Sequence, residues 1–183
     1  STTVSGVTVN VETPVVLSGG WDPTFSASDP DVKKTRLVLT GGILVSHGTG
    51  TTTIDGFIME GGSGGLDVTP INGRYGGAVR VLYSSAVISR CELRANDAGA
   101  GFGGGGAVYA GGANLVVDNS FIHDNAATRG GGVYLYQSTG TISNTTVSGN
   151  VVALGGGITP EGAGVAIHNC GNVTLNACTI GGN

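Results

Sequence analysis

Residues 105–125 read GGAVYAGGANLVVDNSFIHDN, and residues 130–150 read GGGVYLYQSTGTISNTTVSGN. Both stretches start with small residues, carry apolar residues at matching places and end in Asn. Similar copies run over 76–96 and 162–183. Seventeen residues separate the Val from the final Asn in the first three copies (79 to 96, 108 to 125, 133 to 150), and the last copy (165 to 183) has one more. This constant register indicates a repeat protein in which each copy forms one structural unit.

The pattern continues upstream in a degraded form in which Gly20, Gly42 and Gly62 replace the final Asn. We therefore predict one domain over 1–183, with degenerate coils in 1–62 and regular repeats in 75–183. The variable spacing between unit ends is assigned to loops such as 63–74 and 97–103. On this alignment the apolar file three residues before each unit end consists of Leu17, Leu39, Met59, Leu93, Ile122, Val147 and Ile180.

Within a unit, apolar residues alternate with other residues in three short runs. A period of two is typical of β-strands, so each unit has three strands and three bends. One coil cannot bury its inward side chains alone, whereas coils stacked about 4.8 Å apart complete the backbone ladders. The sequence therefore predicts an all-β protein, a parallel β-helix (β-solenoid) with three strands per coil and about seven coils.

The bends have their own residue requirements. We expect the Asn that ends each unit to take the left-handed conformation and its amide to bond along the rod. We expect the Gly pairs before Val79, Val108 and Val133 to lie where a side chain would clash with the next coil.

The composition excludes several other classes of protein. Gly makes up 36 of the 183 residues, but it has no three-residue period, which excludes collagen. Charged residues are only 11% and apolar residues 39%, which excludes a solvated disordered chain. The net charge of -4 argues against a nucleic-acid partner, and no apolar stretch is long enough to predict a membrane span.

The repeat resembles a known family. Gly-Gly-Ala-Val at 76–79, followed by an aliphatic residue, two further residues and Asn, is similar to the repeats of polymorphic outer-membrane adhesins. More broadly it resembles right-handed parallel β-helix proteins of bacterial and archaeal surfaces. Residues 17–25 and 54–62 are similar to coils of secreted β-helix proteins. The resemblance implies a right-handed coil, a location outside the cell or at its surface, and an adhesive, structural or glycan-related role.

One outward file is a candidate ligand-binding site. It contains Arg80, Tyr109 and Tyr134, and it ends in Ala166. Tyr rings stack on sugar rings and Arg bonds to hydroxyls or carboxylates, so an exposed stripe of these side chains would suit a glycan or a protein partner. Two alternatives remain open: the Tyr pair stabilises the sheet, or a loop or partner covers it.

Catalytic, metal and disulfide candidates are weak. Asp118, His123 and Asp124 are the acidic and basic residues considered for catalysis, and we interpret them as solvated turn residues. The segment 61–68 is similar to a Ca²⁺-binding nonapeptide, but it occurs once and is interpreted as a loop. We predict no cofactor and no metal. A Cys170–Cys178 bridge is conceivable within one coil, although we favour free thiols for all three Cys, including Cys91.

These observations predict a non-catalytic extracellular module, a surface scaffold or adhesin whose side binds a cell-surface or extracellular glycan or protein. A polysaccharide lyase or glycoside hydrolase of the β-helix type is one alternative. A structural subunit of an extracellular filament or complex is another. Because the sequence carries no evident cap for the open coil ends, we also expect it to belong to a longer chain or to stack on other chains.

Overall fold

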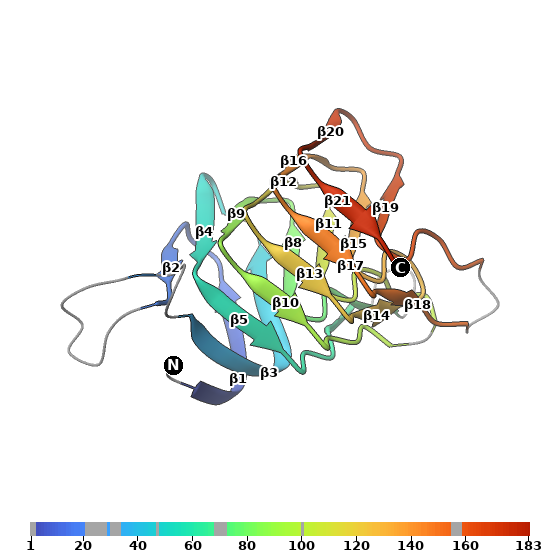
Figure 1. Ribbon diagram of the computed structural model, residues 1–183. Coiled ribbons are helices and arrows are strands. Elements are labelled where there is room, and N and C mark those ends of the chain that lie inside the picture. Colours follow the sequence, from blue (N-terminus) through green and yellow to red (C-terminus); the bar gives the residue numbers. More distant parts are fainter. Residues whose placement is uncertain are drawn as a thin grey trace.

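The structure is a computed structural model that describes residues 3–20, 29, 34–46, 48–67, 73–99, 101–154 and 159–183. Within these residues every regular element is a β-strand. Most strands pair in parallel and the coils stack along one axis, from β1 at the N-terminal end to β21 at the C-terminal end (Figure 1). The prediction of an all-β parallel solenoid is therefore confirmed. No helix of the described residues is long and apolar enough to cross a membrane.

Each coil contributes to three faces. Two long strands, β1 (Thr3–Val11) and β3 (Thr35–Ser46), pair with each other and run through both face 1 and face 2. Face 1 continues from β3 through β5 (Phe57–Glu60), β10 (Glu92–Arg94), β13 (Phe121–His123), β17 (Thr146–Ser148) and β21 (Thr179–Gly181). Face 2 continues from β3 through β8 (Val79–Leu82), β11 (Val108–Gly111), β15 (Val133–Tyr136) and β19 (Val165–His168).

Face 3 is a separate sheet of six strands. It consists of β2 (Val16–Ser18), β4 (Thr51–Asp55), β9 (Ser85–Ser89), β12 (Asn114–Asp118), β16 (Thr139–Ser143) and β20 (Val173–Asn176). We call the bend between faces 1 and 2 the first corner, the bend between faces 2 and 3 the second corner, and the bend between faces 3 and 1 the third corner. Two small strand pairs lie in the long segments at the first corner: β6 (Gly65–Asp67) with β7 (Gly73–Tyr75), and β14 (Ala126–Ala127) with β18 (Val151–Val152).

The core consists of files of equivalent apolar side chains. On face 1, Leu93 pairs with Met59 on one side and Ile122 on the other, and the file continues through Val147 to Ile180. The four central members of this file are completely buried, whereas Ile180 in the last strand is 43% exposed. The predicted vertical file is therefore confirmed over its regular part.

The predicted alignment of the degenerate coils is wrong. Leu37, and not Leu39, pairs with Met59 on face 1. Leu17 pairs with Ile54 and so belongs to face 3. The reason is that β3 passes through the first corner as one continuous strand, with no Asn amide to mark the bend, so a Gly alone does not fix the register. Residues 21–25 of the similar block 17–25 lie outside the described residues.

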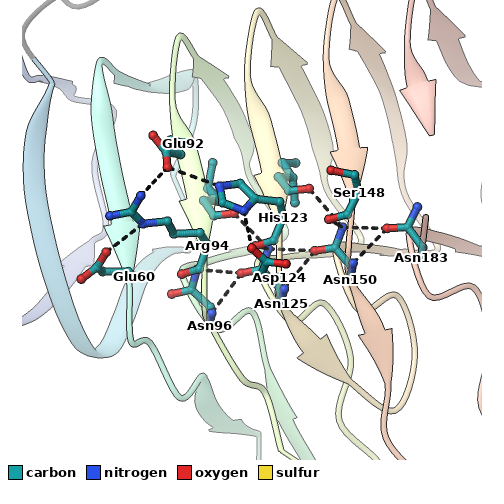
Figure 2. A network of polar contacts seen from close by, with 12 residues as sticks. Glu60, Glu92, Arg94, Asn96, His123, Asp124, Asn125, Ser148, Asn150 and Asn183 are labelled. Carbon is teal, nitrogen blue, oxygen red and sulfur yellow. Dashed lines mark hydrogen bonds and ion pairs between the residues drawn. The ribbon is translucent and has the colours of Figure 1, made fainter. Parts of the chain in front are cut away.

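An amide ladder holds the first corner together. Asn96 donates from Nδ2 to Oδ1 of Asn125 at 2.9 Å, Asn125 donates likewise to Asn150 at 2.9 Å, and Asn150 to Asn183 at 2.9 Å (Figure 2). The predicted ladder is confirmed, but the predicted left-handed conformation of these Asn residues is wrong. The residue before each of them takes it instead: Ala95, Asp124, Gly149 and Gly182.

The Gly pairs lie where close packing demands them. An added Cβ at Gly106 would stand 2.1 Å from the carbonyl oxygen of Gly131 in the next coil, and one at Gly77 would stand 1.9 Å from that of Gly106. These contacts are backbone to backbone, so no side chain rearrangement could relieve them. The expected clash is confirmed.

Candidate functional site

The predicted binding file has the expected register. Tyr109 pairs with Arg80 in the coil below and with Tyr134 in the coil above, and Tyr134 pairs with Ala166. The expected exposure of this file is wrong. Tyr109 is only 7% exposed and Tyr134 only 3%.

Segments from the first corner cover these side chains. Arg80 donates from Nη1 to the carbonyl oxygen of Leu66 at 3.3 Å, so the hairpin of β6 and β7 lies over it. Tyr75, at the end of that hairpin, places its ring 4.5 Å from the ring of Tyr109. Gly104 of the next segment lies directly against the ring of Tyr134. Segment 61–68, interpreted as a plain loop, therefore forms part of a hairpin; Val68 lies outside the described residues.

Aromatic rings form a row over three coils, from the buried Tyr109 and Tyr134 to His168, whose side chain is 41% exposed. Tyr109 and Tyr134 have centroids 5.6 Å apart, Tyr134 and Tyr136 6.3 Å, and Tyr136 and His168 5.7 Å. Burial raises the pKa of the Tyr134 hydroxyl above its usual value. A row packed between a sheet and its covering segments stabilises the fold, which matches the alternatives that the sequence left open.

Face 1 carries a network of ion pairs on its outer side (Figure 2). Glu60 accepts hydrogen bonds from Arg36 and from Nε of Arg94, the latter at 2.9 Å. Nη1 of Arg94 also contacts Glu92 at 2.7 Å. The guanidinium of Arg36, and then that of Arg94, lowers the pKa of Glu60, and the pKa of Arg94 is raised in turn, chiefly by Glu60.

His123 connects this network to the next coil. Its Nε2 lies 3.3 Å from Glu92 and its Nδ1 lies 2.7 Å from Asp124, as Figure 2 shows. The ring of Phe121 stacks on the imidazole with centroids 4.0 Å apart. Asp124 is a solvated corner residue, as predicted, with its side chain 68% exposed. His123 is not: it lies within β13 and its side chain is only 16% exposed.

Two more carboxylates lie on face 3. Asp118 accepts from Ser143 at 2.7 Å and from Asn144 at 2.9 Å, and these hydrogen bonds lower its pKa. Asp55, which the sequence analysis did not consider, occupies the same file two coils earlier. Nε of Arg90 donates to it at 2.9 Å, and this hydrogen bond is the main cause of its lowered pKa. Hydrogen-bonded carboxylates of this kind remain ionised and are poor proton donors.

The structure also shows whether the three Cys thiols are bonded. All three Cys are free, in agreement with the favoured alternative. Cys91 is buried at the third corner, and this burial raises its pKa to about 11, which keeps it protonated and unreactive. Among the described residues, no group of three or more His, Cys, Asp or Glu side chains is placed to hold a metal ion.

The second corner carries an open groove of about 680 Å³. It extends over five consecutive coils, from the segment after β3 to the turn after β19. Among the described residues that line it, none is charged; they are Gly48, Gly50, Tyr83, Ser84, Ser85, Gly112, Ala113, Asn114, Gln137, Ser138, Thr139, Asn169 and Gly171.

Local sequence explains this groove. Each coil turns at the second corner on one left-handed residue, and these residues are Tyr83, Gly112, Gln137 and Asn169. The residue that follows points inward; in two coils it is a Ser whose hydroxyl accepts a backbone N–H of a neighbouring coil (Ser84 from Gly48, Ser138 from Ala113, both at 3.0 Å). Gly48, Gly50, Gly112 and Gly171 contribute no side chains to the lining, and the ring of Tyr83 lies over Gly112.

Sequence reasoning missed this groove because it searched the strands and not the bends. The usable signal was the corner position two to four residues before a face 3 strand, where an aromatic residue, a Gly and two amides occur in successive coils. A smaller hollow of about 470 Å³ at the third corner is lined by Lys34, Arg90, Asn119, Ser120, Phe121 and Asn144.

Comparisons with known proteins agree with the architecture. The family described as "Right handed beta helix region" matches residues 38–183, which is most of the chain. Searches of curated proteins and of solved structures gave no significant match. The match begins within β3 and contains every coil that follows it. The coil stacking and this match together show that the chain belongs to the right-handed β-helix family.

Proposed function

We propose that this chain is a non-catalytic module of an extracellular or cell-surface protein, and that it binds glycan or protein along its side. The observation that carries the proposal is the groove at the second corner. It offers hydrogen-bonding amides and hydroxyls from four of its five coils, on a frame whose corners are fixed by ladders of hydrogen bonds. A rigid surface of this kind binds without a large cost in conformational entropy.

The acidic side chains support the non-catalytic part of the proposal. Glycoside hydrolysis needs a carboxylic acid with a raised pKa beside a second carboxylate. Here Asp55, Glu60 and Asp118 all have lowered pKa values because they accept hydrogen bonds from neighbouring side chains. They are suited to holding adjacent coils together and not to donating a proton.

Polysaccharide cleavage is the second candidate, and one observation favours it. His123 lies between Glu92 and Asp124 on an outer face, beside the partly exposed ring of Phe121. A base and two carboxylates around an aromatic surface are groups that a lyase or hydrolase uses.

One experiment separates the two candidates. The purified chain is incubated with neutral and uronic-acid polysaccharides, and the release of reducing ends and of unsaturated products is measured beside binding in affinity gels. We expect binding without product. Product release that disappears in Asp118→Asn or in His123→Ala would overturn the non-catalytic proposal, because these substitutions remove the groups available for proton transfer.

A further inference from the structure

We propose that the groove at the second corner holds a linear, uncharged polysaccharide that lies along the rod axis, with Tyr83 as its stacking platform. This inference rests on the proposed function, and it adds the ligand class, its direction and the residues that select it.

The lining selects against charge. Every described residue that lines the groove is uncharged, so a uronate or sulfate group would lose its hydration there without gaining a cationic partner among them. Asn114, Gln137 and Asn169 are exposed amides that both donate and accept hydrogen bonds, and Thr139 adds a hydroxyl. Sugar hydroxyls also both donate and accept, so these groups are complementary to a neutral glycan. The hollow at the third corner differs, because Lys34 and Arg90 line it.

Tyr83 supplies an apolar surface in this polar groove. It is 70% exposed, and its ring lies over Gly112 of the next coil, where an added Cβ would stand 2.8 Å from the ring. The backbone at Tyr83 is left-handed, with φ of 49°, which holds the side chain outward at the corner. An exposed ring held in this way suits the apolar face of a pyranose.

The repeat of the groove matches a polysaccharide better than a peptide. The corner residues Tyr83, Gly112, Gln137 and Asn169 recur once per coil, as do Ser85, Asn114 and Thr139 beside them. Coils in a parallel ladder are about 4.8 Å apart, which is close to the length of one pyranose residue in a 1,4-linked chain. An extended peptide advances about 3.3 Å per residue, so its side chains on one face recur only at about 6.6 Å and do not match the coil spacing. A glycan along the axis can therefore place about one sugar residue beside each coil.

The test is affinity electrophoresis of the 183-residue chain in gels that contain one polysaccharide each. Neutral probes are glucomannan, arabinoxylan and hydroxyethylcellulose, and anionic probes are polygalacturonate and dextran sulfate. We expect retardation by at least one neutral probe and none by the anionic ones. Removal of the ring in Tyr83→Ala should weaken the affinity about tenfold. Gln137→Ala should also weaken it, because one amide of the series is lost.

Matched controls come from the third corner and from face 1. Asn119→Ala removes an exposed left-handed amide, and Phe121→Ala removes an exposed ring, both away from the groove. Both should bind as the unsubstituted chain does. Alanine is acceptable at these corners because Ala95 and Ala177 already have left-handed backbones here. Gly112→Asn provides a further variant. Its Cβ would stand 2.8 Å from the ring of Tyr83, so the ring must leave its place over Gly112 and binding should weaken.

The outcomes separate the inference from the proposed function. Neutral-glycan binding that survives Tyr83→Ala, Gln137→Ala and Gly112→Asn overturns the inference and leaves the proposed function standing. Binding of the anionic probes alone also overturns it. Retardation by none of the probes overturns the inference together with the glycan part of the proposed function. Melting temperatures of all variants show whether a loss of binding reflects a loss of folding.

Discussion

Asn125 shows how much one side chain does in this fold. It is completely buried, and its Nδ2 lies within hydrogen-bond distance of three acceptors: the carbonyl oxygens of Leu93 and His123 and Oδ1 of Asn150. Its Oδ1 accepts from the backbone and the side chain of Asn96. The side chain thus satisfies polar groups in three successive coils.

Asn125→Ala should therefore destabilise the chain by about 3 kcal/mol or more, because several buried polar atoms lose their partners. Urea denaturation measures the loss. Asn119→Ala is the matched control, since that amide is exposed and, among the described side chains, donates only to its neighbour Asp118, and it should cost less than about 1 kcal/mol. Equal losses for the two variants would show that the ladder contributes no special stability.

The stability of the fold should also fall in acid. Asp55, Glu60 and Asp118 have pKa values lowered by folding, so their contribution is complete above the unfolded values near 4 and is lost as the pH falls through the folded values. We expect the melting temperature to be level near neutral pH and to fall below about pH 4. Glu60→Gln should reduce this dependence, because it removes one of the three groups. A slope unchanged by Glu60→Gln would contradict the role given to its ion pairs.

At the scale of the element, the corners determine how strands stack. Gly106 precedes β11, and its backbone passes so close to Gly131 that only hydrogen fits between them. Gly106→Ala should destabilise the chain by more than about 3 kcal/mol or prevent folding, because backbone atoms must move apart. Gly181→Ala is the control, since nothing lies within 4 Å of its added Cβ. Circular dichroism and the melting temperature measure both, and a stable Gly106→Ala variant would contradict the packing described here.

The elements also show what the sequence could and could not predict. The strands of the regular repeats were predictable because alternating apolar residues and a fixed Val-to-Asn spacing mark them, as at Val108 and Asn125. The register of β2 and β3 was not predictable, because a Gly has no side chain that identifies the corner at which it lies. The burial of Tyr109 was not predictable either, because the hairpin of β6 and β7 that covers it does not follow the pattern of the repeat. The groove arose from left-handed bends such as Gln137, which are set by backbone geometry and not by hydropathy.

At the scale of the whole molecule, burial changes from the centre of the rod to its last coils. Ile122 in β13 is completely buried, whereas Ile180 in β21 is 43% exposed and Leu175 in β20 is 45% exposed. Each inner side chain needs a coil on both sides, and the last coil has a neighbour on one side only. Stability in a solenoid is approximately a sum of terms between adjacent coils.

The same substitution should therefore have unequal effects along one file. Ile122→Ala should cost about 3 to 4 kcal/mol, and Ile180→Ala should cost about 1 kcal/mol, because the second side chain already faces water on one side. Denaturant midpoints measure both. A similar loss at the two positions would indicate that the end of the file is covered in solution.

In the regular repeats most of the length variation occurs at one edge, and the last copy adds one residue at the second corner. The segments that follow Asn96, Asn125 and Asn150 differ in length, yet all leave the rod at the first corner and return to it in register at Val108, Val133 and Val165. Peptides inserted into these segments would extend from the first corner, and the pairing of the sheets would not have to change. The segments between these Asn and Val residues are therefore suitable sites for grafted sequences, and the Asn ladder and the sheets can stay as they are.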